Sequence, residues 1–87
     1  MVNGESFTVA AKPLVEYLGY EIRERREQRD VSQEALAFEA GLHRNVIGRL
    51  ERGEYNPSLE TLISIQRALD VPLSELIVGA EIGRAHV

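Results

Sequence analysis

The sequence predicts an all-α fold of five short helices, and three observations support this prediction. Near the start of the chain, Leu14, Leu18 and Ile22 stand at i, i+4 and i+8, which is helical spacing. Two further segments, each with one apolar side, are closed by Gly41 and Gly53. A strongly apolar segment then lies between two prolines, which break helices. The 87 residues are enough for one small domain.

The first helix is predicted over residues 13–29, PLVEYLGYEIRERREQR. Pro13 suits a first helical turn, where a missing N–H group costs nothing. Tyr17 lies near the apolar face, whereas Gly19 weakens the helix by about 1 kcal/mol relative to alanine. The arginines and glutamates of the last two turns are expected to form a solvated, self-paired surface.

The second and third helices are predicted between Ser32 and Gly53. Ser32 suits an N-cap, and Gly41 suits the left-handed residue that ends a helix before a sharp change of direction. The next helix follows within two residues, which leaves room only for a tight turn. Its apolar side carries Ile47 and Leu50, with Val46 at the edge. Its other side carries Arg44, Asn45, Gly48, Arg49 and Arg52. Two short helices, the second of which carries a row of hydrogen-bond donors on one side, are typical of a helix-turn-helix that binds DNA.

The fourth and fifth helices are predicted after the turn EYNPS. Asn56-Pro57 disfavours helix before the proline, and Ser58 can cap the apolar helix that follows. Asp70-Val71-Pro72 ends that helix, so a short fifth helix is expected at about residues 72–78. The predicted core comprises Leu18, Ile22, Leu36, Ala37, Ala40, Leu42, Ile47, Leu50, Leu59, Leu62, Ala68, Leu69, Val71, Leu73 and Leu76.

The predicted helix-turn-helix domain spans residues 12–78, with an arm before it and a tail after it. Residues 1–11 have no sustained period and no basic residue, so a flexible arm that does not wrap DNA is expected. Residues 79–87 are predicted to be a tail. Ile82 to Val87 match the in-frame translation of a widely used sequencing adapter, so residues 81–87 are interpreted as an assembly artefact. A missing C-terminal domain stays an alternative.

The chain resembles the Xre-like helix-turn-helix family, which includes the lambdoid phage repressors. The resemblance is carried by four sequence motifs taken together, SQ, AG, I-x-x-LERG and NPSLETL. The resemblance covers about Leu18 to Val78. It implies a compact five-helix, lambda-repressor-like DNA-binding domain, usually a homodimer on a pseudo-palindromic operator. Two positions depart from the family. Arg25 stands where an apolar residue is usual, and Asp30 stands where glycine is usual, although aspartate adopts the left-handed conformation less readily.

The predicted recognition helix, about residues 43–52, carries the candidate DNA contacts. Arg44, Asn45 and Arg49 are expected to contact bases, since arginine can pair with guanine and asparagine with adenine. The resemblance implies that the Gln33 side-chain amide binds a phosphate. An equal alternative is that Gln33 is only a solvent-exposed residue at the start of its helix. His43 is predicted to be a helix cap or a phosphate contact. The predicted phosphate contacts are Gln33, His43 and Arg52.

Two further pairs of residues have predicted structural roles. Arg26 shares a helix face with Ile22, and the resemblance implies Glu51 as its acidic partner, so a partly buried ion pair is expected. Ile77 and Val78 are apolar residues at the edge of the domain, which predicts a dimer interface on the fifth helix. The alternatives are that they finish the monomer core or were once covered by a lost segment.

Composition limits the classes of function. The chain has no cysteine, no metal-ligand spacing, no nucleophile beside a base and no phosphate-binding glycine loop, so neither an enzyme nor a cofactor is expected. It has no apolar run of membrane length and no signal peptide, which predicts a cytoplasmic protein without a membrane partner.

The net charge of −4 opposes DNA binding, because Lys and Arg supply much of the affinity for phosphates. The charge is unevenly distributed, however. Residues 23–52 hold seven arginines and six acids, net +1, and the rest holds three basic and eight acidic residues, net −5. The leading prediction is a small transcriptional regulator, either repressor or controller, that binds a double-stranded DNA operator. The alternative is an antitoxin-type subunit with a protein partner, which the acidic balance and Phe38 on the outer side of the second helix favour.

Overall fold

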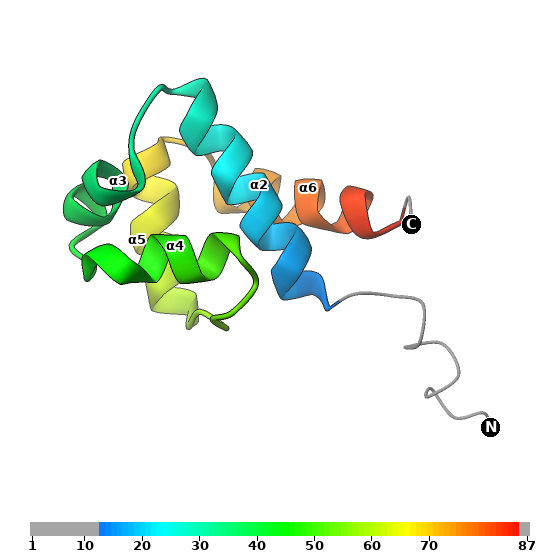
Figure 1. Ribbon diagram of the computed structural model, residues 1–87. Helices are drawn as coiled ribbons and strands as arrows, with labels where there is room; N and C mark the ends of the chain where they lie inside the picture. Colours follow the sequence, from blue (N-terminus) through cyan, green and yellow to red (C-terminus); the bar gives the residue numbers. More distant parts are fainter. Residues whose placement is uncertain (1–12, 86–87) are drawn as a thin grey trace.

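The computed structural model describes residues 13–85, and these residues form five helices and no strand (Figure 1). The helices are α2 (Leu14–Gln28), α3 (Gln33–Ala40), α4 (Arg44–Glu51), α5 (Leu59–Leu69) and α6 (Leu73–Ala85). The predicted all-α class is therefore confirmed, and four of the five helices lie close to their predicted ranges. The predicted N-terminal arm, residues 1–11, falls outside the described residues.

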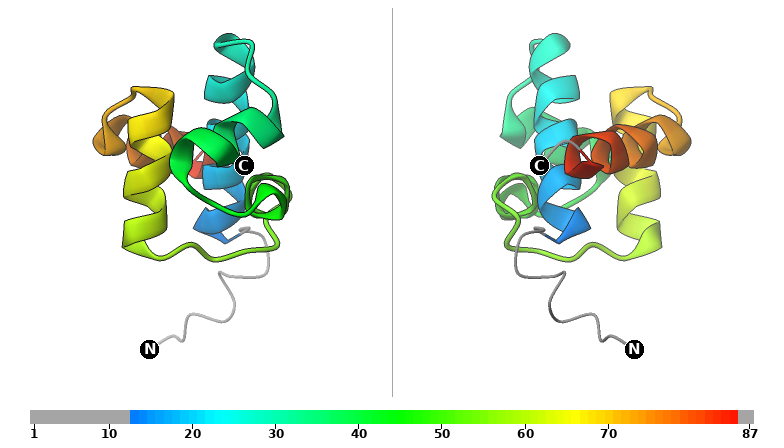
Figure 2. Two further views of the ribbon diagram at one scale, coloured as in Figure 1. Left: turned by 90° about the vertical axis from the view of Figure 1, so that its left-hand side faces the viewer. Right: turned by 90° about the vertical axis from the view of Figure 1, so that its right-hand side faces the viewer.

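Helix α2 lies at the centre of the arrangement. It packs against α4 on one side and α6 on the other, while α3 packs against α4 and α5. Figure 2 shows α6 lying across α2, on the side opposite to the α3–α4 pair. The two helices of the predicted helix-turn-helix are thus held by α2 and α5 together.

Short-range signals in the sequence explain most of the helix ends. The Ser32 hydroxyl accepts a hydrogen bond from the Ala35 amide at 3.0 Å, and the Ser58 hydroxyl accepts one from Thr61 at 3.1 Å. Gly41 adopts a left-handed conformation with φ 70°, and the next amide bonds back to the Ala37 carbonyl at 2.8 Å. The predicted caps and the turn after Gly41 are therefore confirmed.

Helix α2 ends through Asp30, a residue that the family resemblance places at a glycine position. Asp30 has φ 58°, so it adopts the left-handed conformation without being glycine. Its amide donates to the Glu27 carbonyl at 3.0 Å, and the Val31 amide donates to the Arg26 carbonyl at 3.3 Å. The chain makes the same turn that glycine would allow, at a higher conformational cost.

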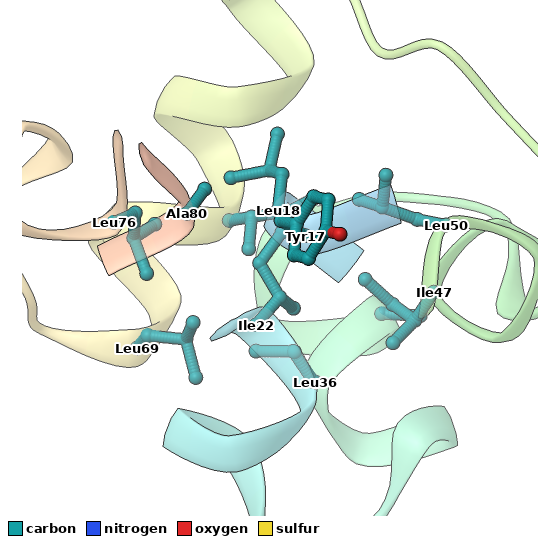
Figure 3. Close-up of a cluster of buried hydrophobic side chains, with 11 residues drawn as sticks. Tyr17, Leu18, Ile22, Leu36, Ile47, Leu50, Leu69, Leu76 and Ala80 are labelled. Carbon is teal, nitrogen blue, oxygen red and sulfur yellow. The ribbon is translucent and has the colours of Figure 1, made fainter. Parts of the chain in front are cut away.

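The core contains side chains from all five helices (Figure 3). Most of the predicted core is confirmed. The predicted residues that are buried are Leu18, Ile22, Leu36, Ala37, Ile47, Leu50, Leu69 and Leu76. Those that are partly buried and pack against them are Ala40, Leu42, Leu62, Ala68, Val71 and Leu73.

The prediction of Leu59 in the core is wrong, because its side chain is 64% exposed. Leu59 has the right spacing relative to the buried residues of α5, but it is the first residue of that helix. Little of the fold covers the helix there, so periodicity alone misplaced it. Three buried hydrophobic residues were absent from the predicted core, namely Tyr17, Ile65 and Ala80.

The predicted end of the last helix at Val78 is also wrong, since α6 continues to Ala85. Ala80 is buried, and Gly83 lies so close to α2 that a Cβ there would be 3.4 Å from the Tyr17 ring. Packing against α2 therefore supports the helix through residues 79–85, which were predicted to be a tail. The origin of residues 81–87 stays a prediction.

Candidate nucleic-acid interface

The helix-turn-helix consists of α3, a tight turn at residues 41–43, and α4. The inward side of α4 is anchored by Ile47 and Leu50, which are fully buried. The predicted donors lie on the exposed part of the same segment, which places them on one accessible surface. The exposed residues are Arg44, Asn45, Arg49 and Arg52.

Gly48 is buried, although the sequence placed it among the outward residues. A Cβ there would lie 3.2 Å from the Arg52 Nη1 atom and 3.3 Å from the Gln33 Oε1 atom. The side chains of Gln33 and Arg52 therefore both lie over Gly48. The fold brings together two predicted phosphate contacts from different helices, and the absence of a side chain at Gly48 makes the room.

His43 caps the recognition helix. Its Nδ1 atom accepts a hydrogen bond from the Asn45 amide at 3.2 Å, which confirms the predicted cap. An accepting Nδ1 requires the neutral tautomer with the proton on Nε2, a donor that the cap does not use. A contact from this donor to a DNA phosphate stays a prediction.

The predicted ion pair between Arg26 and Glu51 is confirmed, and it is bidentate. The Arg26 Nε atom lies 2.7 Å from Glu51 Oε2, and Nη2 lies 3.1 Å from Oε1. The side chains are 11% and 3% exposed. A third guanidinium nitrogen donates to the Val31 carbonyl at 2.8 Å. The pair joins the first described helix to the end of α4 and also holds the turn after α2.

The Glu51 hydrogen bonds raise the pKa of Arg26 above its ordinary value, against the opposing effect of burial. A group whose folded-state pKa is raised contributes its stability at every pH below the unfolded pKa, and loses it only above that value. The arginine side of this pair is therefore charged throughout the accessible pH range.

Sequence reasoning missed the role of Gln33 in this network. Its Nε2 atom donates to Glu51 Oε1 at 2.9 Å, so one carboxylate oxygen accepts from both Gln33 and Arg26. A buried carboxylate has more acceptor capacity than one guanidinium fills, which was the available signal. The amide retains a second N–H group, and its contact with a phosphate stays a prediction.

The exposed arginines of the recognition segment have different neighbours. Arg44 lies 3.8 Å from Glu34, and both side chains are 73% exposed. Arg52 lies 3.2 Å from Glu54, another exposed pair. Arg49 instead lies over the ring of Tyr55, with its guanidinium carbon 5.6 Å from the ring centroid. Exposed ion pairs contribute little to stability, so Arg44 and Arg52 can exchange these carboxylates for other partners.

The predicted dimer residues on α6 have different environments. Ile77 is partly buried and packs against the core, whereas Val78 is 50% exposed. One turn later, Ile82 is 53% exposed. The exposed apolar patch of α6 is therefore Val78 and Ile82. It borders a groove that is also lined by Arg25, Ser74, Glu75 and Gly79.

Residues 13–85 contain neither of two other kinds of site. No helix in this range is long and apolar enough to span a membrane. In the same range, His, Asp and Glu side chains form no group of three or more that could hold a metal ion.

The arrangement of α3, the turn and α4 is that of a helix-turn-helix domain, and sequence comparison agrees. Residues 22–76 match the sequence profile of the helix-turn-helix family. The match covers more than half of the chain, which therefore belongs to this family, as its resemblance to the Xre-like members predicted.

The chain is similar to several control and controller proteins. It is 42% identical over 62 residues to the control protein C.SmaI of Serratia marcescens, covering 71% of this chain and 74% of the relative. It is 41% identical over 69 residues to C.BamHI of Bacillus amyloliquefaciens, covering 78% and 85%. The crystal structure of the controller protein C.AhdI from Aeromonas hydrophila superimposes with a TM-score of 0.70 at 40% identity, covering 71% of this chain and 94% of that one. The protein is a DNA-binding transcriptional regulator.

Proposed function

We propose that this regulator acts as a small repressor or controller that places α4 in the major groove of a pseudo-palindromic operator. The supporting observation is the two-sided environment of α4. Ile47 and Leu50 are fully buried, while Arg44, Asn45 and Arg49 are exposed in its first and middle turns. Recognition helices of this kind contact base edges through their N-terminal part.

Phosphate contacts from both helices would set the register of α4 on the DNA. Gln33 and Arg52 both lie over Gly48, and His43 stands at the start of α4. Helix N-termini also attract phosphates through their free amides. These contacts position the protein without distinguishing one sequence from another.

The assignment of Arg49 to a base contact is tested by selecting binding sites from a randomised DNA library. Arg49→Ala should lose the base preference at one position of each half-site, because a bidentate contact discriminates by about 1–3 kcal/mol. Arg67→Ala, at an exposed arginine of α5, is the matched control and should keep the preferences of the unmodified protein. Unchanged preferences in Arg49→Ala would show that Arg49 does not contact a base.

The assignment of Gln33 to a phosphate is tested by measuring affinity for several operator variants. Gln33→Ala should weaken binding to all of them by a similar factor, because phosphates are the same in every sequence. A loss confined to particular sequences would mean that Gln33 contacts bases instead.

We further propose that the regulator binds as a homodimer. One recognition helix covers only a few base pairs, so specifying one site in a genome requires a second copy. Val78, which is exposed on α6, is the candidate interface residue, with Arg25 and Glu75 of opposite charge beside it. Ile77 contributes less to the interface than the sequence suggested, since it packs against the core. A two-fold axis there would set the recognition helices about 34 Å apart, one turn of DNA.

Val78→Glu should produce a folded monomer with much weaker operator binding, as measured by sedimentation and circular dichroism. Leu59→Glu is the matched control, since Leu59 is an exposed leucine on another helix. If the unmodified chain is monomeric at high micromolar concentration, both free and on its operator, the proposal of a homodimer is wrong.

A second candidate function, an antitoxin-type role with a protein partner, is favoured by one observation. Phe38 on α3 is 86% exposed and borders a groove lined by Ala35 and Leu42. Exposed aromatic patches are typical of protein-interaction sites. Phe38→Ser should keep the operator affinity of the purified protein while changing regulation in cells. Unchanged regulation would count against a partner at this patch.

A further inference from the structure

Among the exposed arginines of the recognition segment, Arg49 is the one whose neighbour is an aromatic ring. Arg44 and Arg52 each face a carboxylate, Glu34 and Glu54. Within residues 13–85, Arg49 has no carboxylate partner and no side-chain hydrogen bond, and its guanidinium carbon lies 5.6 Å from the centroid of the Tyr55 ring. A cation within about 6 Å of a ring centroid is attracted to the face of the ring.

The Tyr55 ring is held in place by the fold. Tyr55 is partly buried and packs against the hydrophobic core, although it stands in the loop between α4 and α5. Gly53, with φ 73°, turns this loop, and the Glu54 amide donates to the carbonyl of Arg49 itself at 2.9 Å. The backbone of the residue before Tyr55 is thus tied to the residue whose side chain Tyr55 contacts.

We propose that Tyr55 is a positioning residue that prepares Arg49 for its base contact. The inference rests on the proposed function, in which Arg49 contacts a base. A free arginine side chain loses much rotamer freedom when it binds, and a side chain already restrained in a suitable conformation loses less. Contact with the ring restrains the guanidinium without occupying its N–H donors. A carboxylate neighbour would instead engage those donors and compete with the base.

The proposal is tested by a set of variants in one binding-site selection. The set contains the unmodified protein, Arg49→Ala, Tyr55→Phe, Tyr55→Leu and the double variant Arg49→Ala/Tyr55→Leu. Tyr55→Leu keeps an apolar side chain against the core but removes the ring. At the position that Arg49→Ala alters, Tyr55→Leu should lower discrimination by about twofold to fivefold, the range of an exposed cation–π contact. Tyr55→Phe should retain it, and the double variant should match Arg49→Ala.

Relative base preference is the decisive readout, because it does not depend on what fraction of the protein is folded. A loss of stability in Tyr55→Leu therefore cannot imitate the expected result. Tyr20→Leu removes a half-exposed tyrosine from α2 and is the matched control, which should leave all preferences unchanged.

The outcomes separate the two levels of the proposal. If Arg49→Ala alters no base preference, the proposed base contact of Arg49 is wrong. If Arg49→Ala alters one position and Tyr55→Leu leaves that position intact, the base contact stands and the role of Tyr55 is overturned. The role of the ring is also overturned if Tyr55→Phe loses as much discrimination as Tyr55→Leu, because the hydroxyl would then be the group that matters.

Discussion

Helix α2 makes a close glycine contact with each of its two neighbours, and the two contacts differ in kind. On the α4 side, a Cβ at Gly19 would lie 2.3 Å from the Leu50 carbonyl oxygen. On the α6 side, a Cβ at Gly79 would lie 2.4 to 2.6 Å from the carboxyl group of Glu21. A backbone carbonyl inside a helix cannot move independently, whereas a glutamate side chain can rotate away. The approach of α4 to α2 at Gly19 therefore tolerates an added side chain less readily than the approach of α6 at Gly79 does.

The ion pairs on the two sides of α2 differ in the same direction. Arg26 and Glu51, on the α4 side, are 11% and 3% exposed and share two hydrogen bonds. Arg25, on the α6 side, is 29% exposed and reaches Glu21 at 3.0 Å and Glu75 at 3.3 Å. Adjacent arginines of one helix thus belong to a buried network and to a partly exposed one. Burial, more than charge, therefore decides how strongly each junction depends on its ion pair.

The largest expected effect comes from breaking the buried pair. Glu51→Ala should lower the free energy of unfolding by about 3–5 kcal/mol, because it leaves the Arg26 charge buried without its partner. For a domain of this size, each kcal/mol lowers the melting temperature by about 4–8 °C, which thermal unfolding would detect. Glu54→Ala is the matched control, since Glu54 forms an exposed pair with Arg52, away from Arg26. A Glu51→Ala variant as stable as this control would show that the pair is unimportant.

The double variant Arg26→Met/Glu51→Leu sharpens this result. Replacing both charges by apolar side chains of similar volume should recover much of the stability lost in Glu51→Ala. It should not restore the hydrogen bond from Gln33, so operator affinity should remain below that of the unmodified protein. Full recovery of affinity would show that Glu51 does not position Gln33.

The second effect concerns the close approach of α2 and α4. Gly19→Ala should destabilise the fold by about 2 kcal/mol, because overpacking against backbone outweighs the gain of about 1 kcal/mol in helix propensity. Chemical denaturation would measure the difference. An alanine variant that is more stable than the unmodified protein would contradict the contact with Leu50.

A smaller effect is expected on the α6 side from the partly exposed arginine. Arg25→Ala should cost less than about 1 kcal/mol, the usual range for a solvent-exposed ion pair. The loss should shrink in high salt, since salt screens such charges. The hydrogen bond that Arg25 donates to Glu21 raises the pKa of Arg25, so the arginine side of this pair stays charged at pH values below the ordinary arginine pKa. A salt-independent loss would indicate a packing role instead.

The smallest effect should come from Gly79→Ala. The Glu21 side chain can rotate away from the new methyl group, at the expense of its pair with Arg25. The helix gains about 0.8–1 kcal/mol in propensity, so the net change in unfolding free energy should be within about 0.5 kcal/mol of zero. Comparing Gly79→Ala with Gly19→Ala in the same denaturation experiment tests the contrast directly. Equal losses would mean that the two glycine positions tolerate a methyl group equally well.

The amino-acid sequence by itself determined the features that depend on neighbours along the chain. Ser32 and Ser58 cap helices, Gly41 makes the turn of the helix-turn-helix, and the periodic residues of α4 give it one buried side. These features follow from local hydrogen bonds and helical spacing, which reach only a few residues. The Arg26–Glu51 pair spans 25 residues, and it was predictable because the family resemblance supplied the partner.

The tertiary structure alone decided the features that depend on which surfaces meet. Gly19 counted as a weak point of its helix from local propensity, yet it is where α4 approaches α2. Gln33 joins the buried pair, Leu59 is exposed at a helix end, and α6 continues to Ala85 because Ala80 packs against the core. In each case the deciding atom belongs to a residue distant in sequence, and helical periodicity holds no information about which element covers a given face.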